Sequence, residues 1–209
     1  MKKAFQQIES QGVIAIVRGR YTLEQLLAIG ETLVGAGVTV LEITLNTSNV
    51  LAGIEQLRLR YDDAILVGAG TVRTAVQLEQ ALSAGAQFTV APNFDAEAVA
   101  VALVNDFLHL PGVFTATEAE TAVRAGCRVL KLFPSDMLGP RYLKALRAPL
   151  DDIQFVPTGG ISAANIGDYR RAGAFACGIG SALVSNPEQS MTELAERGRA
   201  LRRAWDEAG

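Results

Sequence analysis

Val129-Leu130-Lys131-Leu132-Phe133-Pro134 is an apolar, strand-like run that ends at a proline and carries one lysine in its middle. Successive side chains of a strand point to opposite faces, so Lys131 shares a face with Val129 and Phe133. Lysine is rarely buried, because an ammonium group in an apolar environment loses its hydration. Such an environment would lower the pKa of Lys131, and the free amine could attack a ketone to form a Schiff base. Alternatively, a lysine at a strand edge would only extend its head into water.

Seven further strand-like runs alternate with helix signals along the chain. The eight predicted strands occupy residues 13–18, 38–45, 65–70, 88–91, 107–111, 129–133, 154–158 and 175–179. Capping-box patterns such as Thr115-Ala116-Thr117-Glu118 predict helix starts between the strands, and Asn186-Pro187 predicts the start of the last helix. Ala4, Phe5 and Ile8 predict a short helix before the first strand.

This alternation predicts the fold class. Eight strand–helix units without a linker or low-complexity segment indicate an α/β fold, a single (β/α)8 TIM barrel with a short N-terminal helix, in one domain over residues 1–209. A doubly wound open sheet is the alternative, and it would be expected to carry a glycine fingerprint after the first strand. Arg18-Gly19-Arg20 does not match that fingerprint.

Composition limits the possible functions. Because 49% of the 209 residues are hydrophobic and 20% are charged, the chain can bury a sizeable core. The net charge of −3 predicts no nucleic-acid or anionic-membrane partner. We expect neither a membrane span nor a signal peptide. The spacing of Cys127 and Cys177 fits neither a disulfide scaffold nor a metal site, so a reducing, cytoplasmic location is expected.

The second predicted strand carries a carboxylate on the face expected to line the barrel interior. Leu41 and Ile43 share the face that suits the surrounding helices, whereas Glu42 lies on the opposite face. Glu42 could form a structural ion pair with Arg18 or Lys131. With a lysine on the same side of the barrel wall, pairing and catalysis are compatible.

Two glycine-rich segments follow the last two predicted strands. Thr158-Gly159-Gly160-Ile161 follows the seventh strand, and Gly178-Ile179-Gly180-Ser181 includes the end of the eighth. Barrels often bind phosphate with these two loops, because glycine allows close backbone approach and free amides at a helix start attract an anion. A single glycine pair usually marks a tight turn, but two segments at the two expected places predict a phosphate site, to which Ser181 could add a hydroxyl donor.

Six segments together resemble a known enzyme family. They are Leu41-Glu42-Ile43-Thr44-Leu45-Asn46, Gly68-Ala69-Gly70-Thr71-Val72, Ala91-Pro92-Asn93, Leu130-Lys131-Leu132-Phe133-Pro134, Thr158-Gly159-Gly160-Ile161 and Gly178-Ile179-Gly180-Ser181. In this order they resemble the bacterial aldolases that cleave 2-keto-3-deoxy-6-phosphogluconate (KDPG) or its galactonate epimer (KDPGal). The resemblance implies a class I aldolase that yields pyruvate and glyceraldehyde 3-phosphate, uses no metal or cofactor, and forms a homotrimer.

The resemblance also implies roles for individual residues. Lys131 would be the Schiff-base lysine, and Glu42 would be the general acid/base. The implied phosphate ligands are Gly159, Gly160, Gly180 and Ser181. The implied contacts with the rest of the substrate are Arg18, Asn46, Thr71, Pro92, Phe133 and Thr158. Arg18 could bind the substrate carboxylate through two parallel hydrogen bonds.

The epimer and the activity itself have open alternatives. Asn46 and Asn93 resemble the galactonate branch of the family, whereas Thr158 resembles the gluconate branch. Cleavage of 4-hydroxy-2-oxoglutarate would use the same pyruvate half of the site. A metal-dependent aldolase would need several histidine or carboxylate ligands, and the only histidine is His109. Another small phosphate-binding barrel, or a non-catalytic phosphosugar-binding protein, would keep the glycine segments without requiring Lys131.

Overall fold

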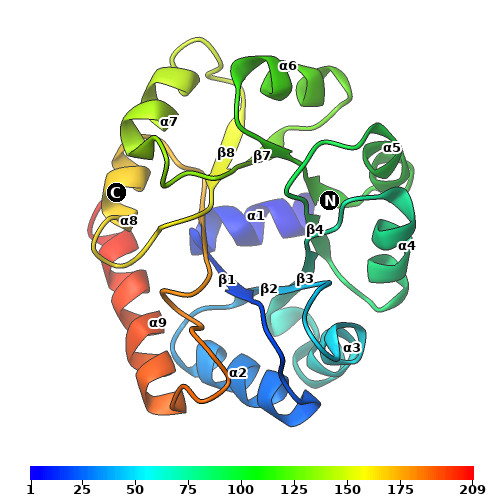
Figure 1. The fold of residues 1–209 in the computed structure, drawn as a ribbon, viewed down its shortest axis with the longest axis vertical. Helices are drawn as coiled ribbons and strands as arrows, with labels where there is room; N and C mark the ends of the chain where they lie inside the picture. Colours follow the sequence, from blue (N-terminus) through cyan, green and yellow to red (C-terminus); the bar gives the residue numbers. More distant parts are fainter.

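The computed structural model describes residues 1–209 as an α/β fold in which helices surround parallel strands (Figure 1). The strands are β1 (Val13–Val17), β2 (Val40–Thr44), β3 (Leu66–Gly70), β4 (Phe88–Val90), β5 (Leu108–Leu110), β6 (Gly112–Val113), β7 (Val129–Leu132), β8 (Gln154–Pro157) and β9 (Cys177–Ile179). The helices are α1 (Lys2–Gln11), α2 (Leu23–Gly35), α3 (Val50–Tyr61), η1 (Asp62–Ala64, a 3-10 turn), α4 (Ala75–Ser83), α5 (Ala96–Val104), α6 (Ala116–Arg124), α7 (Gly139–Arg147), α8 (Ile166–Arg171) and α9 (Met191–Asp206).

All strand pairs are parallel, and they form two sheets. The larger sheet is curled and has the order β5-β4-β3-β2-β1-β9, and the smaller sheet has the order β6-β7-β8. A parallel bridge between Thr158 and Gly178 connects the end of β8 to β9. The α/β class predicted from the sequence is therefore confirmed, in the form of a curled half-barrel of six strands with a second sheet of three.

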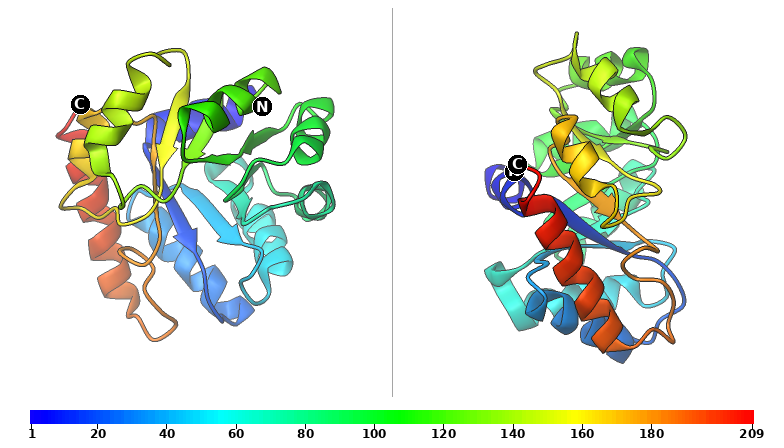
Figure 2. Two further views of the ribbon diagram at one scale, coloured as in Figure 1. Left: turned by 45° about the horizontal axis from the view of Figure 1, so that its top comes forward. Right: turned by 90° about the vertical axis from the view of Figure 1, so that its left-hand side faces the viewer.

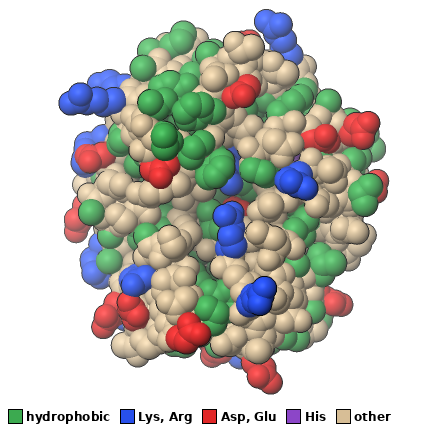
Figure 3. All heavy atoms as spheres, viewed as in Figure 1, with side chains coloured by type: hydrophobic (Ala, Val, Ile, Leu, Met, Phe, Trp, Pro, Cys, Tyr) green, Lys and Arg blue, Asp and Glu red, His purple; other side chains and the backbone are tan.

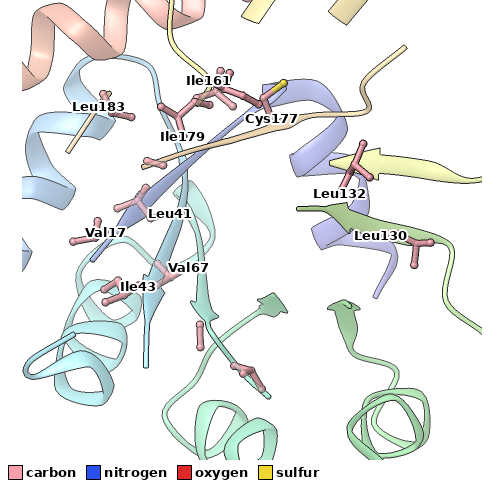
Figure 4. Packing of buried hydrophobic residues seen from close by; sticks show 14 of the residues in the cluster. Val17, Leu41, Ile43, Val67, Leu130, Leu132, Ile161, Cys177, Ile179 and Leu183 are labelled. Atoms are coloured by element: carbon pink, nitrogen blue, oxygen red, sulfur yellow. The ribbon is translucent and has the colours of Figure 1, made fainter. Parts of the chain in front are cut away.

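The alternation of side chains along the strands agrees with the sequence pattern. Leu41 of β2 and Leu130 of β7 belong to a core cluster of 45 buried residues that strands and helices build together (Figure 4). Val40 and Val129, their neighbours on the opposite face, belong to a separate cluster of 13 buried residues that includes side chains from both sheets. Glu42 and Lys131 follow two residues later on this second face.

Helix α1 closes the end of the molecule from which the strands start (Figure 2). Its residues Ala4 and Ile8 belong to the second cluster, and the Phe5 ring lies 4.7 Å from the Phe175 ring. The helix ends at Gly12, whose φ of 65° is in the left-handed region that favours glycine, and a Cβ there would collide with the Trp205 ring of α9. The predicted short N-terminal helix is therefore confirmed.

Several predicted boundaries differ from the structure, and two of these differences have a clear physical reason. The helix predicted to start at Asn186-Pro187 starts at Met191 instead, because the Ser190 side chain caps it by accepting from the Glu193 amide. Asn186 instead forms a turn in which its Oδ1 accepts from the Glu188 amide at 2.9 Å. The predicted strand 107–111 is shortened to β5, and β6 follows beyond its predicted end, after Pro111, which has no amide to donate. No helix combines the length and the apolar character that crossing a membrane requires.

Candidate active site

Lys131, near the carboxyl end of β7, and Glu42, in the middle of β2, are both buried, and each residue is only 2% exposed. The backbone of Lys131 is fixed on both sides, since it pairs with Gly112 of β6 and with Val156 of β8. Its Nζ atom lies 4.7 Å from the centre of the Phe133 ring, within the range of a cation–π contact. The burial predicted for this lysine is confirmed.

Burial changes the proton affinity of both groups. The pKa of Lys131 is lowered, chiefly by desolvation and also by the Arg18 charge, while the Glu42 charge raises it. The pKa of Glu42 is raised by desolvation, against the opposing effects of Lys131 and Arg18. Both pKa shifts are directed towards neutral pH, so they favour the free amine of Lys131 and the protonated carboxyl group of Glu42. Acid–base catalysis near pH 7 requires pKa values shifted in this way.

Neither the Lys131 amine nor the Glu42 carboxyl group forms a structural ion pair. No salt bridge within 4.0 Å involves Glu42, Lys131 or Arg18. The Oε1 atom of Glu42 is buried without a hydrogen-bond partner, and a Cβ on Gly70 would collide with this carboxylate. The structural ion pairs considered from the sequence are therefore not formed, and the Glu42 oxygen remains able to exchange a proton with a ligand.

A cavity of about 390 Å³ opens beside Lys131 at the carboxyl ends of the strands. The predicted site residues that line it are Arg18, Lys131, Phe133, Thr158, Gly159, Gly160, Gly180 and Ser181. Ser162 and Ser185 also line it, and no sequence motif had selected them as site residues. Eight of the twelve predicted residues thus meet at one place.

The glycine segments present backbone to this cavity. Gly159 and Gly160 have φ angles of 109° and 64°, and a Cβ on Gly160 would come within 2.5 Å of the Asp136 Cβ. The Asn165 side-chain amide donates to the Gly160 carbonyl at 2.9 Å and so fixes the loop. A Cβ on Gly180 would meet no atom within 4 Å, so this glycine borders open space. Such a surface lets an anion approach backbone amides closely.

The remaining predicted residues lie outside the lining of this cavity. Asn46 and Thr71 border a separate hollow of about 280 Å³, and Pro92 borders another of about 450 Å³. Glu42 lines none of the three hollows. Arg73 borders both of the smaller hollows and was not selected from the sequence, although it directly follows the segment Gly68–Val72.

Cationic side chains surround the hollow at the centre of this face (Figure 3). Arg18, Arg20 and Arg73 lie on the loops that follow β1 and β3, and all three are exposed. None of them forms a salt bridge. These arginines therefore remain available to attract an anionic ligand.

His109 has no part in this site. It is buried on β5, and its Nδ1 lies 2.8 Å from the Thr89 hydroxyl. Burial lowers its pKa to about 4, so the ring is neutral at pH 7, and Nε2 has no partner. It is a buried residue of which only one ring nitrogen has a hydrogen-bond partner. No group of three or more His, Cys, Asp or Glu residues is placed to hold a metal ion.

An α/β fold of parallel strands, with a buried lysine at a glycine-lined cavity and a buried carboxylate on the same inner face of the strands, has the features of the lysine-dependent aldolases as a class. The chain belongs to one family of that class, because the family model described as "Aldolase: KDPG and KHG aldolase" matches residues 6–196.

Curated relatives support the same assignment. The 2-dehydro-3-deoxy-6-phosphogalactonate aldolase of Escherichia coli (strain K12) is 37% identical, over 94% of this chain and 95% of that protein. The 2-dehydro-3-deoxy-phosphogluconate aldolase of Treponema pallidum (strain Nichols) is 38% identical, over 90% of this chain and 88% of that protein. Two relatives named for different epimers are thus almost equally similar to the chain.

A solved structure of the family has the same fold. KDPG aldolase from Legionella pneumophila, with pyruvate captured at low pH as a covalent carbinolamine intermediate, matches with a TM-score of 0.83 and 27% identity. The match covers 99% of this chain and 98% of the Legionella chain. The likeness therefore extends over the whole fold, including the strand that carries Lys131.

Proposed function

We propose that the chain is a class I aldolase, a carbon–carbon lyase that cleaves KDPG or KDPGal to pyruvate and glyceraldehyde 3-phosphate. The observation that carries the proposal is the buried amine of Lys131, with its lowered pKa, in a cavity bordered by Gly159 and Gly160. Family membership and the pyruvate adduct captured in the Legionella relative support it.

The reaction follows from two buried groups. The Lys131 amine attacks the C2 ketone, and Glu42 transfers protons as the carbinolamine loses water to give a protonated imine. Glu42 then accepts the proton of the C4 hydroxyl, the C3–C4 bond breaks, and its electron pair moves into the imine to give an enamine. Glyceraldehyde 3-phosphate leaves, and the enamine is protonated and hydrolysed to pyruvate, which regenerates the free amine.

The remaining predicted site residues are proposed to bind the phosphate end and the pyruvate end of the substrate. The proposed phosphate ligands are the backbone of Gly159, Gly160 and Gly180 and the hydroxyl of Ser181, while Phe133 and Thr158 border the reacting carbon next to Lys131. Arg18 is proposed to bind the carboxylate bidentately. Asn46, Thr71 and Pro92 are proposed to contact the pyruvate end from the side of β2, β3 and β4. Binding energy from the phosphate can then orient the bond that breaks.

We further propose that the two sheets form one closed (β/α)8 barrel in a single domain. One seam is bridged by Thr158 and Gly178, and at the other the Gly112 amide donates to the Asn93 carbonyl at 3.1 Å. On the family resemblance we propose a homotrimer, which light scattering on the purified chain would test. A mass other than three chains would contradict it.

The central experiment is chemical trapping. Incubation with pyruvate and sodium borohydride should leave a reduced three-carbon adduct on Lys131, located by peptide mass spectrometry, and Lys131→Met should remove it. Failure of the wild-type chain to form the adduct would exclude the Schiff-base mechanism. EDTA should not change turnover, and a loss that added metal restores would favour the metal-dependent route.

A second activity is the cleavage of 4-hydroxy-2-oxoglutarate, which the family description includes. It would use the same imine chemistry without the phosphate contacts. The kcat/KM values for KDPG, KDPGal and 4-hydroxy-2-oxoglutarate, measured side by side, would identify the preferred substrate.

A further inference from the structure

The segment after β7 is tied to the segment after β8 by a buried hydrogen-bond network around Ser135. The Ser135 hydroxyl donates to the Leu132 carbonyl at 2.7 Å and accepts from the Thr158 amide at 3.1 Å. The Ser135 amide donates to the Thr158 carbonyl at 2.9 Å. Ser135 is 4% exposed and Thr158 is 8% exposed, so these bonds are shielded from competing water.

Helix α8 adds a third anchor to this network. The Tyr169 hydroxyl donates to the Ser135 carbonyl at 3.0 Å, and Tyr169 is 2% exposed. Burial raises the pKa of Tyr169, so its hydroxyl keeps the proton that it donates. Asn165, immediately before α8, fixes the Gly160 carbonyl. One short helix thus holds both the segment after the lysine strand and the glycine loop.

The network lies between the two parts of the site that one substrate molecule must reach at once. Ser135 is four residues after Lys131, and Thr158 immediately precedes Gly159. The backbone at Ser135 also lies directly under the loop, since a Cβ on Gly159 would be 3.3 Å from the Ser135 nitrogen. A small displacement of either segment would change the distance from the amine to the glycine loop.

We propose that Ser135 and Tyr169 are positioning residues that hold the Lys131 amine and the Gly159–Gly160 loop at the separation that the phosphorylated substrate requires. This inference rests on the proposed aldolase function. Neither residue is among those that line the cavity, so both act through the backbone segments that they fix. Pyruvate reaches only the amine, and inorganic phosphate reaches only the loop, so neither ligand depends on the separation.

The test uses Tyr169→Phe, which removes one hydroxyl group and keeps the ring. For the phosphorylated substrate, kcat should fall about tenfold, because misplacement of about 1 Å can cost up to a hundredfold in rate. The pyruvate concentration that gives half-maximal borohydride trapping, and the inhibition constant of inorganic phosphate, should each change less than about twofold. Ser135→Ala should likewise lower kcat while changing pyruvate trapping and phosphate inhibition less than about twofold. Circular dichroism would confirm that both variants fold.

Tyr142→Phe is a matched control, because the Tyr142 hydroxyl also donates to a backbone carbonyl, that of Phe114, at 2.5 Å. Its kcat should equal that of the wild type. The inference is overturned if Tyr169→Phe and Ser135→Ala keep wild-type kcat, if pyruvate trapping falls in parallel with kcat, or if Tyr142→Phe causes the same loss. By contrast, absence of pyruvate trapping in the wild type would reject the aldolase function itself.

Discussion

At the scale of single residues, Glu42 is unusual because its buried Oε1 atom has no hydrogen-bond partner. Glu42→Gln keeps the shape of the side chain but removes the proton that the mechanism moves. We expect turnover to fall by a factor of about 10² to 10⁴, which is the usual contribution of a general acid/base. Thermal unfolding should show a retained fold, because a neutral amide costs less to bury than a carboxylate.

Glu55→Gln is the control for this substitution, since Glu55 is an exposed carboxylate on α3. It should leave turnover unchanged. A Glu42→Gln variant with near-wild-type kcat would remove Glu42 from the mechanism.

The charges near Lys131 predict opposite pH shifts in two variants. The Glu42 charge raises the pKa of Lys131, and the Arg18 charge lowers it. Adduct formation requires the free amine, so its rate should rise with pH through the pKa of Lys131. In Glu42→Gln the midpoint of this rise should move to lower pH, because the charge that favours the ammonium form is gone. In Arg18→Gln it should move to higher pH.

The measurement is the initial rate of pyruvate trapping by borohydride as a function of pH. Arg20→Gln serves as the control, since Arg20 is exposed and is not among the causes of the Lys131 shift. Shifts of the same sign in Glu42→Gln and Arg18→Gln would contradict the electrostatic account.

The sequence predicts the site residues well where the alternation of side chains along a strand decides which face they occupy. Glu42 and Lys131 could be assigned to the inner face because Leu41 and Leu130 occupy the outer one. The roles of Ser135 and Tyr169 could not be predicted, because they depend on hydrogen bonds between residues 23 and 34 positions apart. No local pattern along one strand contains that information.

At the scale of elements, α1 contributes a buried residue to the cluster beneath the site. Ile8 is 0% exposed and packs among side chains from both sheets. Ile8→Ala should lower the free energy of unfolding by about 2 to 5 kcal/mol, the range for deleting a buried aliphatic side chain and leaving a cavity. Urea denaturation would measure the change. Leu59→Ala on α3 is the control, because Leu59 is 73% exposed, and its effect should be near zero.

Element boundaries show where sequence patterns are insufficient. Thr115 and Glu118 form the predicted capping box, because every partner lies within four residues. Asn186-Pro187 has an equally good local signal, yet the helix begins at Met191, after Ser190, which is also a good cap. The Gln189 side chain holds the turn before this helix, since it donates to the buried Leu183 carbonyl at 2.9 Å and accepts from the Ser185 amide at 2.9 Å. Two nearby capping signals therefore compete, and the local pattern alone does not decide between them.

At the scale of the whole molecule, three unpaired arginines lie at the active-site face although the net charge of the chain is negative. The chain carries a net charge of −3, but Arg18, Arg20 and Arg73 are exposed and unpaired at the carboxyl ends of the strands. For an anionic substrate we expect kcat/KM to fall about threefold as ionic strength rises from about 0.02 to 0.2 M, because salt screens the attraction. If the net charge controlled association, kcat/KM would rise instead.

Stopped-flow or coupled assays over a salt series would measure this slope. Arg20→Gln should flatten it. Arg124→Gln should not, since Arg124 lies on α6 and its Nε is 3.9 Å from the Glu120 carboxylate. A slope that is the same in all three proteins would contradict steering by the arginines around the site.

Helix α1, which packs across the start of the strands, also has a consequence for the order in which substrates bind and products leave. With α1 packed across the strand origins, the cavity beside Lys131 lies at the opposite end, where the strands finish. In the proposed mechanism, glyceraldehyde 3-phosphate leaves while the three-carbon fragment is still bonded to Lys131. Release is therefore sequential, and pyruvate added in excess should slow the forward reaction by occupying the amine before a new sugar acid arrives.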